Sequence, residues 1–281
     1  MISIGLTGWG DHDSLYESAG SSEKLQTYAG HFPIVELDSS FYAVQPLSNM
    51  RKWVRETPAS FQFIVKAYQG MTGHQRGEPT FETKEEMFTV FKESLKPLIE
   101  AGKLAMVLCQ FPPWFDLQKN HVQAVRYVRE QLKGFPCALE FRHQSWFSPQ
   151  FKERTLQYMR EDNWIHSVCD EPQAGAGSVP TVLEPTCVEK TLVRFHGRNV
   201  HGWSGPRNGE NWREVRYLYQ YNKLELEEWK EKIAYLNERS KHIYVVFNNN
   251  SGGHAAGNAR QFIEMLGIEY TDLAPRQLDL F

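Results

Sequence analysis

CALEFRH, residues 137–143, is a short run of strand-forming residues in which apolar and charged side chains alternate. Leu139 and Phe141 are apolar, whereas Glu140 and Arg142 are charged. Because successive side chains of a strand point to opposite faces, we expect one face to pack against helices and the other to carry charge. Seven further β-rich runs occur along the chain: ISIGLTGW (2–9), IVELDSSFY (34–42), FQFIVKAY (61–68), LAMVLCQF (104–111), WIHSVCD (164–170), TLVRFHG (191–197) and IYVVFNN (243–249).

The intervals between these eight runs leave room for helices. In Thr83–Glu100, for example, Thr83 and Glu86 form a capping-box pattern, and apolar residues recur at helical spacing. Strict alternation of strands and helices implies a parallel sheet, and eight units allow it to close into a (β/α)8 TIM barrel. An open doubly wound sheet is the alternative, but no GxGxxG motif follows the first run and no P-loop occurs.

The length of 281 residues fits one barrel of this kind, and no repeat or linker divides the chain. We therefore expect an α/β fold with a single barrel domain over residues 1–272 and a C-terminal tail over residues 273–281.

Charge and composition exclude several classes of protein. The formal net charge of −3 provides no overall positive field for nucleic acid or an anionic membrane, so any contact with DNA must be local. The first residues, MISIGLTGWG, do not resemble a signal peptide, and no stretch is apolar enough to span a bilayer. The four cysteines lack CxxC spacing. We expect a cytoplasmic protein with no membrane contact, disulfide or zinc knuckle.

Polar residues gather at the C-terminal ends of the expected strands, where barrel enzymes keep their active sites. Unpaired buried charges are costly, so we expect at least some of these side chains to contact a substrate. The alternative is a network of acids and cations that neutralises itself and closes the barrel. The residues are Glu36 and Asp38, Lys66, Gln110, Glu140 and Arg142, Asp170, Arg194 and His196, and Asn248 and Asn249.

Mixed cations and carboxylates suit an anionic substrate, because Arg and Lys bind phosphate or carboxylate oxygens while an acid or a histidine moves a proton. We expect Glu140, His196, Glu36 and Asp170 to be catalytic, and Lys66, Arg142, Arg194, Gln110, Asn248 and Asn249 to bind substrate. A divalent metal held by Glu36, Glu140, Asp170 and His196 is an alternative, but the cofactor is unknown and nearby cations compete with a metal for these carboxylates.

Loops and aromatic residues extend the candidate site. Three long connections follow strands, at residues 69–82, 171–190 and 197–222. His74 lies in the glycine-rich first loop and is a further substrate-binding candidate, and the third loop holds Arg198 and Arg216 within a basic segment. Trp9, Tyr42 and Trp146 stand near loop starts and could stack on a sugar or base, with ordinary packing as the equal alternative.

Seven segments together resemble the block motifs of the YecE-like TIM-barrel family, which has no established activity: GLTGWG (5–10), VELDSSFY (35–42), FQFIVKAY (61–68), LCQFPPWF (108–115), LEFRHQSW (139–146), VRFHGRN (193–199) and VFNNNSGGHAAGNA (246–259). The resemblance implies the barrel and supports the mouth positions as motif residues, but it implies no reaction. Asp38 departs from the asparagine expected at its position.

The chain ends in Gln277, Leu278, Asp279, Leu280 and Phe281. This pentapeptide is similar to the one by which bacterial replication and repair proteins dock on the DNA polymerase sliding clamp. An extended tail could place its apolar residues in a pocket of a partner. The alternative is that the tail covers an apolar patch on its own barrel.

These features favour an enzyme, of hydrolase or lyase class, that acts on an anionic phosphate-containing substrate such as DNA or a nucleotide and is tethered to the clamp, which suggests DNA repair. One alternative is a metabolic enzyme acting on a phosphorylated sugar or small acid, which a narrow mouth closed by residues 69–82 would favour. The other is a non-catalytic adaptor that binds the clamp.

Overall fold

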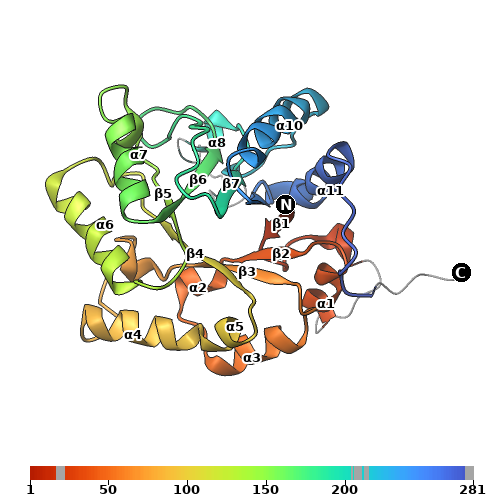
Figure 1. The fold of residues 1–281 in the computed structure, drawn as a ribbon, viewed down its shortest axis with the longest axis horizontal. Coiled ribbons are helices and arrows are strands. Elements are labelled where there is room, and N and C mark those ends of the chain that lie inside the picture. The colour runs from red at the N-terminus through yellow and green to blue at the C-terminus, as the bar shows by residue number, and fades with distance from the viewer. Residues whose placement is uncertain (17–22, 204, 206–210, 212–214, 276–281) are drawn as a thin grey trace, which may run out of the picture.

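Eight parallel strands form a closed barrel in which each strand pairs with the next and β8 pairs with β1. In Figure 1, β1 to β7 are labelled in the middle of the molecule, with helices such as α3, α4, α6 and α10 outside them. The computed structural model describes residues 1–16, 23–203, 205, 211 and 215–275. The predicted (β/α)8 fold is confirmed. The strands are β1 (Ile2–Thr7), β2 (Ile34–Leu37), β3 (Gln62–Lys66), β4 (Leu104–Gln110), β5 (Cys137–Glu140), β6 (Trp164–Asp170), β7 (Lys190–Phe195) and β8 (His242–Phe247).

Helices surround the barrel, as expected for parallel strands joined by crossovers. The helices are α1 (Lys24–Ala29), α2 (Ser39–Tyr42), α3 (Leu47–Arg55), α4 (Lys84–Ser94), α5 (Lys96–Glu100), α6 (Lys119–Gln131), α7 (Lys152–Glu161), α8 (Val200–Trp203), α10 (Lys223–Asn237) and α11 (His254–Met265). Short 3-10 turns lie at Asp13–Leu15, Gln69–Met71, Gln144–Phe147 and Ser251–Gly253. Within the described residues, every helix is too short or too polar to cross a membrane.

The segment predicted as one helix from Thr83 to Glu100 is two helices. Pro97 lies in the first turn of α5 and has no N–H to continue the ladder of α4. The expected N-cap is present, because the Thr83 side chain accepts a hydrogen bond from the Glu86 N–H at 3.0 Å. The return bond of the capping box goes elsewhere: Glu86 Oε2 accepts from the N–H of Glu82 at 2.9 Å.

The alternation of strand residues divides the core into two layers. Leu37, Val65, Leu139, Val193 and Phe195 belong to the larger cluster that packs between the strands and the helices. The opposite strand faces supply a smaller cluster inside the barrel, which includes Ile34, Ile64, Met106, Leu108, Ala138, Ile165, Leu192 and Val246. The predicted direction of Leu139 and Phe141 is therefore confirmed, and the polar residues Glu36, Glu140 and Arg194 continue the interior face toward the C-terminal ends of β2, β5 and β7.

The chain returns to the barrel after α11. The Tyr270 hydroxyl accepts a hydrogen bond from the Ile4 N–H, and the Ala274 N–H donates to the Ala29 carbonyl. Contact with the barrel therefore continues two residues past 272. The clamp-type pentapeptide, Gln277 to Phe281, lies outside the described residues.

Strands β1 and β2 approach each other closely at Gly5, and this predicts an effect of substitution there on stability. A Cβ atom added at Gly5 would lie 2.1 Å from the carbonyl oxygen of Ile34, a backbone atom that cannot move without disturbing the sheet. We expect Gly5→Ala to lower the free energy of unfolding by at least about 2 kcal/mol, measured by urea denaturation. Gly10→Ala is the control, because nothing lies within 4 Å of its Cβ position. Equal stability of the two variants would contradict the described packing.

Candidate functional site

Arg194 joins two carboxylates inside the C-terminal end of the barrel. It extends from β7, and its Nη2 and Nε donate to Glu36 Oε1 and Oε2 at 2.6 and 2.8 Å. Its Nη1 donates to both oxygens of Glu140, at 2.9 and 2.8 Å, and lies 3.4 Å from Gln110 Oε1. The side chains of Arg194, Glu36 and Glu140 are at most 1% exposed. These charges are thus satisfied by one another across β2, β5 and β7.

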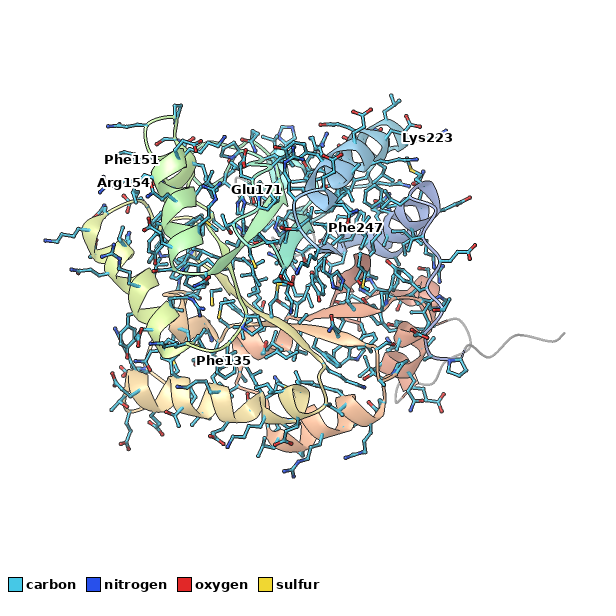
Figure 2. All side chains as sticks on the ribbon, in the orientation of Figure 1. Phe135, Phe151, Arg154, Glu171, Lys223 and Phe247 are labelled. Atoms are coloured by element: carbon cyan, nitrogen blue, oxygen red, sulfur yellow. The ribbon has the colours of Figure 1, made fainter. Side chains whose placement is uncertain are left out.

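Arg142, two residues past Glu140, extends this network toward the loops. Its Nε donates to Glu140 Oε1 at 2.7 Å, and its Nη1 donates to Glu171 Oε2 at 2.8 Å. Its Nη2 lies 3.0 Å from His196 Nε2, and Asn248 Nδ2 lies 2.9 Å from His196 Nδ1. Figure 2 labels Glu171 near β6 and β7. The structure therefore brings together Glu36, Gln110, Glu140, Arg142, Arg194, His196 and Asn248, as predicted, and adds Glu171.

The surroundings of Glu140, Glu171 and His196 shift their pKa values in different directions. Burial alone would raise the pKa of Glu140, but the charges of Arg194 and Arg142 outweigh it and hold that pKa well below its ordinary value. Burial raises the pKa of Glu171 to about 7, despite the opposing charge of Arg142. Burial and the same two arginines hold the pKa of His196 well below its ordinary value. Near neutral pH, Glu140 is therefore an anion, His196 is neutral, and Glu171 exchanges its proton.

The loop at residues 69–82 reaches the same mouth. Lys66, at the end of β3, pairs with Asp38 at 3.0 Å, and its Nζ lies 4.6 Å from the centre of the Phe41 ring. The His74 ring packs edge-on against Phe41 at 5.0 Å. Burial, then the charges of Lys66, Arg142 and Arg216, lower the pKa of His74 to about 3. His74 is therefore a neutral group beside the cations of the mouth.

The segment after β7 contributes aromatic and basic groups from another side. The guanidinium carbon of Arg142 lies 5.0 Å from the centre of the Trp203 ring, and that of Arg216 lies 4.5 Å from the same ring. Tyr217 lies 6.1 Å from the ring of His196. Burial would raise the pKa of Tyr217, but Arg216 and Arg142 lower it below its ordinary value. The loop at residues 197–222 therefore meets Arg142 through Trp203, and the loop at residues 171–190 meets it through Glu171.

The prediction for Asp170 is wrong in its direction. On β6, Ile165 lies inside the barrel, and Ser167 donates to Glu140 Oε2 at 2.9 Å, so the odd-numbered residues face the interior. Asp170 faces the other way, and both of its oxygens accept from Arg198 Nε, at 3.1 and 3.0 Å. Glu171 takes the interior position instead. Continuing the alternation from Ile165 would have identified it.

Several predicted binding residues have packing roles or lie at the rim. Trp146 stacks on Phe141 at 3.9 Å and donates its N–H to the Phe115 carbonyl, so it is a core residue. Trp9 packs edge-on against Trp53 of α3 at 5.3 Å. Asn249 donates to the Tyr219 carbonyl and to Asn258 of α11. Tyr42 lies on α2 and is 55% exposed.

A metal fits these donors poorly. Within the described residues, ligand atoms of Glu140, Cys169 and His196 lie within 4.8 Å of one another. Glu140 already accepts from two arginines, and burial raises the pKa of the Cys169 thiol well above its ordinary value. The alternative set with Asp170 is excluded by the direction of that side chain. The groups at the mouth therefore match an anion better than a divalent cation.

Comparison with known proteins finds a family and several relatives. The family described as "Protein of unknown function DUF72" matches residues 3–279. The UPF0759 protein YunF of Bacillus subtilis is 64% identical over 282 residues, covering 100% of both chains. The UPF0759 protein YecE of Escherichia coli is 27% identical over 157 residues, 56% of this chain and 54% of that protein.

Two solved structures have the same fold over nearly the whole chain. A DUF72 family protein from Enterococcus faecalis (EF0366) has a TM-score of 0.92 and 39% identity, covering 99% of this chain and 100% of that one. A DUF72 family protein from Thermotoga maritima (TM1631) has a TM-score of 0.80 and 31% identity, covering 95% and 100%.

The acidity of Glu171 predicts a pH dependence of stability. Its pKa rises from 4.5 in the unfolded chain to about 7 on folding, so the folded state binds more protons between these values. The contribution of Glu171 to stability is therefore fully present below pH 4.5 and is lost as the pH rises through 7. We expect Glu171→Gln to reduce the fall in unfolding free energy between pH 5 and pH 8, measured by urea denaturation. The exposed Glu189→Gln is the control, and identical pH profiles for all three proteins would contradict the assignment.

Proposed function

This chain belongs to the DUF72 family of proteins of unknown function, the YecE-like family that its motifs resemble, and we propose that it is an enzyme that transfers protons on a small anionic substrate. The observation that carries this proposal is the pair of carboxylates on Arg142. Glu140 and Glu171 bind the same guanidinium group, yet their pKa values are driven in opposite directions. Pairs of carboxylates whose pKa values are shifted in opposite directions are typical of acid–base catalysis.

The charges of the mouth favour an anion. Lys66, Arg142 and Arg194 lie at the mouth with the carboxylates Glu36, Asp38 and Glu140, and Glu171 adds no charge when it is protonated. An anion bound beside Arg142 weakens the effect of that guanidinium charge on Glu171 and favours the protonated form of Glu171. Substrate binding thus keeps the proposed acid ready to donate its proton.

The same binding step activates a base. The pKa of His196 is low because the ring is buried and lies near Arg142 and Arg194. An anion that neutralises Arg142 removes part of this effect, so the pKa of His196 rises and the ring becomes a better proton acceptor. We assign Glu171 as the general acid, His196 as the base, and Arg142 with Lys66 and Arg216 as the groups that hold the anion. Glu36 holds Arg194 in position, and Glu140 holds both Arg194 and Arg142.

Burial of the network favours a small substrate. Arg194 is 1% exposed, and His74 and Trp203 approach the mouth from different loops. A phosphorylated sugar or small acid fits such an enclosed site better than a DNA strand, which requires an open groove. We therefore place the metabolic alternative ahead of a polymeric substrate, and a hydrolase or lyase reaction remains the proposed class.

Variants of Glu171 and Arg142 test this function. A panel of sugar phosphates and small carboxylic acids is first screened by thermal shift, and hits are measured by calorimetry and for conversion. We expect Arg142→Gln to weaken binding at least tenfold, because it removes the charge that contacts the anion. We expect Glu171→Gln to bind but not to convert the substrate.

Asp170→Asn is the matched control, since Asp170 neighbours Glu171 but points toward Arg198. Circular dichroism checks that each variant is folded. Wild-type conversion by Glu171→Gln, or an equal loss in Asp170→Asn, would refute the assignment of the acid. Binding without conversion of any compound by the wild type would favour a non-catalytic adaptor.

We also propose that residues 277–281 tether the barrel to a bacterial sliding clamp. The sequence Gln-Leu-Asp-Leu-Phe supports this, together with its place after Ala274, whose N–H makes the last described backbone bond to the barrel. Such a tether would carry the enzyme to sites of DNA replication and repair.

Deleting residues 277–281 should abolish micromolar binding to a purified sliding clamp and leave the unfolding free energy unchanged. Surface plasmon resonance and urea denaturation measure the two effects. A deletion that destabilises the barrel, in a protein that never binds the clamp, would show that the tail is a packing element.

A further inference from the structure

A cavity of about 390 Å³ lies on the outside of the barrel, between α6 and α7. Its apolar walls include Leu117, Val122, Trp146 and Phe151. Figure 2 labels Phe151 at one end of α7. Trp146 stacks on Phe141 at 3.9 Å, and Phe141 belongs to the layer between strands and helices. The cavity therefore lies behind this aromatic layer and is separate from the barrel mouth.

The sequence of both helices builds the cavity. On α6, Lys119, Val122 and Arg126 are spaced by three and four residues, which places them on one face of the helix. On α7, Arg154 and Tyr158 have the same spacing and line the opposite side. Each helix therefore presents apolar and basic side chains to the same space.

The charge of this space is one-sided. Lys119, Arg126 and Arg154 line it, and among the described residues no carboxylate does. Within the described part of the chain, none of the three forms an ion pair; Arg126 lies 5.7 Å from the centre of the Tyr158 ring. Asp116, adjacent in sequence to the lining residue Leu117, does not line the cavity; its Oδ1 lies 2.9 Å from His121 Nδ1, and its Oδ2 accepts from Gln118 Nε2 at 2.8 Å. The described lining is therefore apolar and positively charged.

The N-terminus of α6 adds to this positive potential. Its N-cap residue, Gln118, lines the cavity and makes no side-chain capping bond, and first-turn N–H groups without such a cap favour an anion nearby. At α7, the Lys152 N–H already donates to the Ser148 carbonyl at 2.9 Å and Glu153 lies in the first turn, so that helix end adds little.

We propose that the α6–α7 cavity binds a small organic anion with a planar apolar body, such as an aromatic phosphate monoester or carboxylate. The planar part packs against the half-buried side chains of Val122 and Phe151, and the anionic group contacts Arg126, Arg154 and Lys119. The volume of the cavity matches a small molecule. This site is independent of the function proposed for the barrel mouth.

Calorimetry with 1-naphthyl phosphate tests the site, with 1-naphthol and inorganic phosphate as partial probes. We expect saturable binding of the intact probe and much weaker binding of either part. The double variant Arg126→Gln/Arg154→Gln should weaken binding at least tenfold. Arg51→Gln/Arg55→Gln is the matched control, because these two exposed arginines carry the same charge but lie on α3, outside the lining of the cavity.

Binding that is unchanged in the Arg126→Gln/Arg154→Gln variant would overturn the proposal, as would no binding to the wild type up to about 1 mM. Lys66→Gln distinguishes this cavity from the mouth. Loss of probe binding in that variant, with retention in the α6–α7 double variant, would place the probe in the barrel mouth instead.

Discussion

The pairing of Arg194 with Glu36 and Glu140 is the interaction on which the C-terminal end of the barrel depends. Each of these charges would be very costly alone in a space that excludes water, and each is stable there because the other two satisfy its hydrogen bonds. The bonds also join strands that are not neighbours in the sheet. The position of β2 is thereby fixed relative to β5 and β7, and Arg142 continues the constraint outward to Glu171 and the loops.

The burial that makes pairing necessary also determines the chemistry. Glu140 has two guanidinium partners and stays ionised, whereas Glu171 has one and lies near the point of half-protonation. His196 is kept neutral by the same arginines. The network looks like a structural cluster of salt bridges. Because its positive charge lies closer to Glu140 than to Glu171, it also leaves Glu171 with a proton that can be exchanged near neutral pH.

The sequence was sufficient to predict the barrel, because strand alternation and the spacing of the eight runs are local properties. It was also sufficient for the interior residues of β2, β5 and β7, where polar and apolar side chains alternate cleanly. On β6 the alternation is obscured: His166 is polar on one face and Ser167 on the other, so the acidic pair Asp170 and Glu171 could be assigned only by counting from Ile165. The role of Trp146 depends on the Phe115 carbonyl of another loop, which no local pattern reveals.

The separation of the paired residues along the chain has a consequence for how the protein folds. Glu36 and Arg194 are 158 residues apart, so the carboxylate leaves the ribosome long before its partner is made. Until β7 has been synthesised and has joined the sheet, Glu36 must remain hydrated, and water cannot be excluded from the interior at the C-terminal end of the barrel. Closing so long a loop is entropically costly and slow. Completion of the barrel is thus a late event in folding, and an incomplete chain would retain an open, water-accessible interior at the end that later forms the candidate active site.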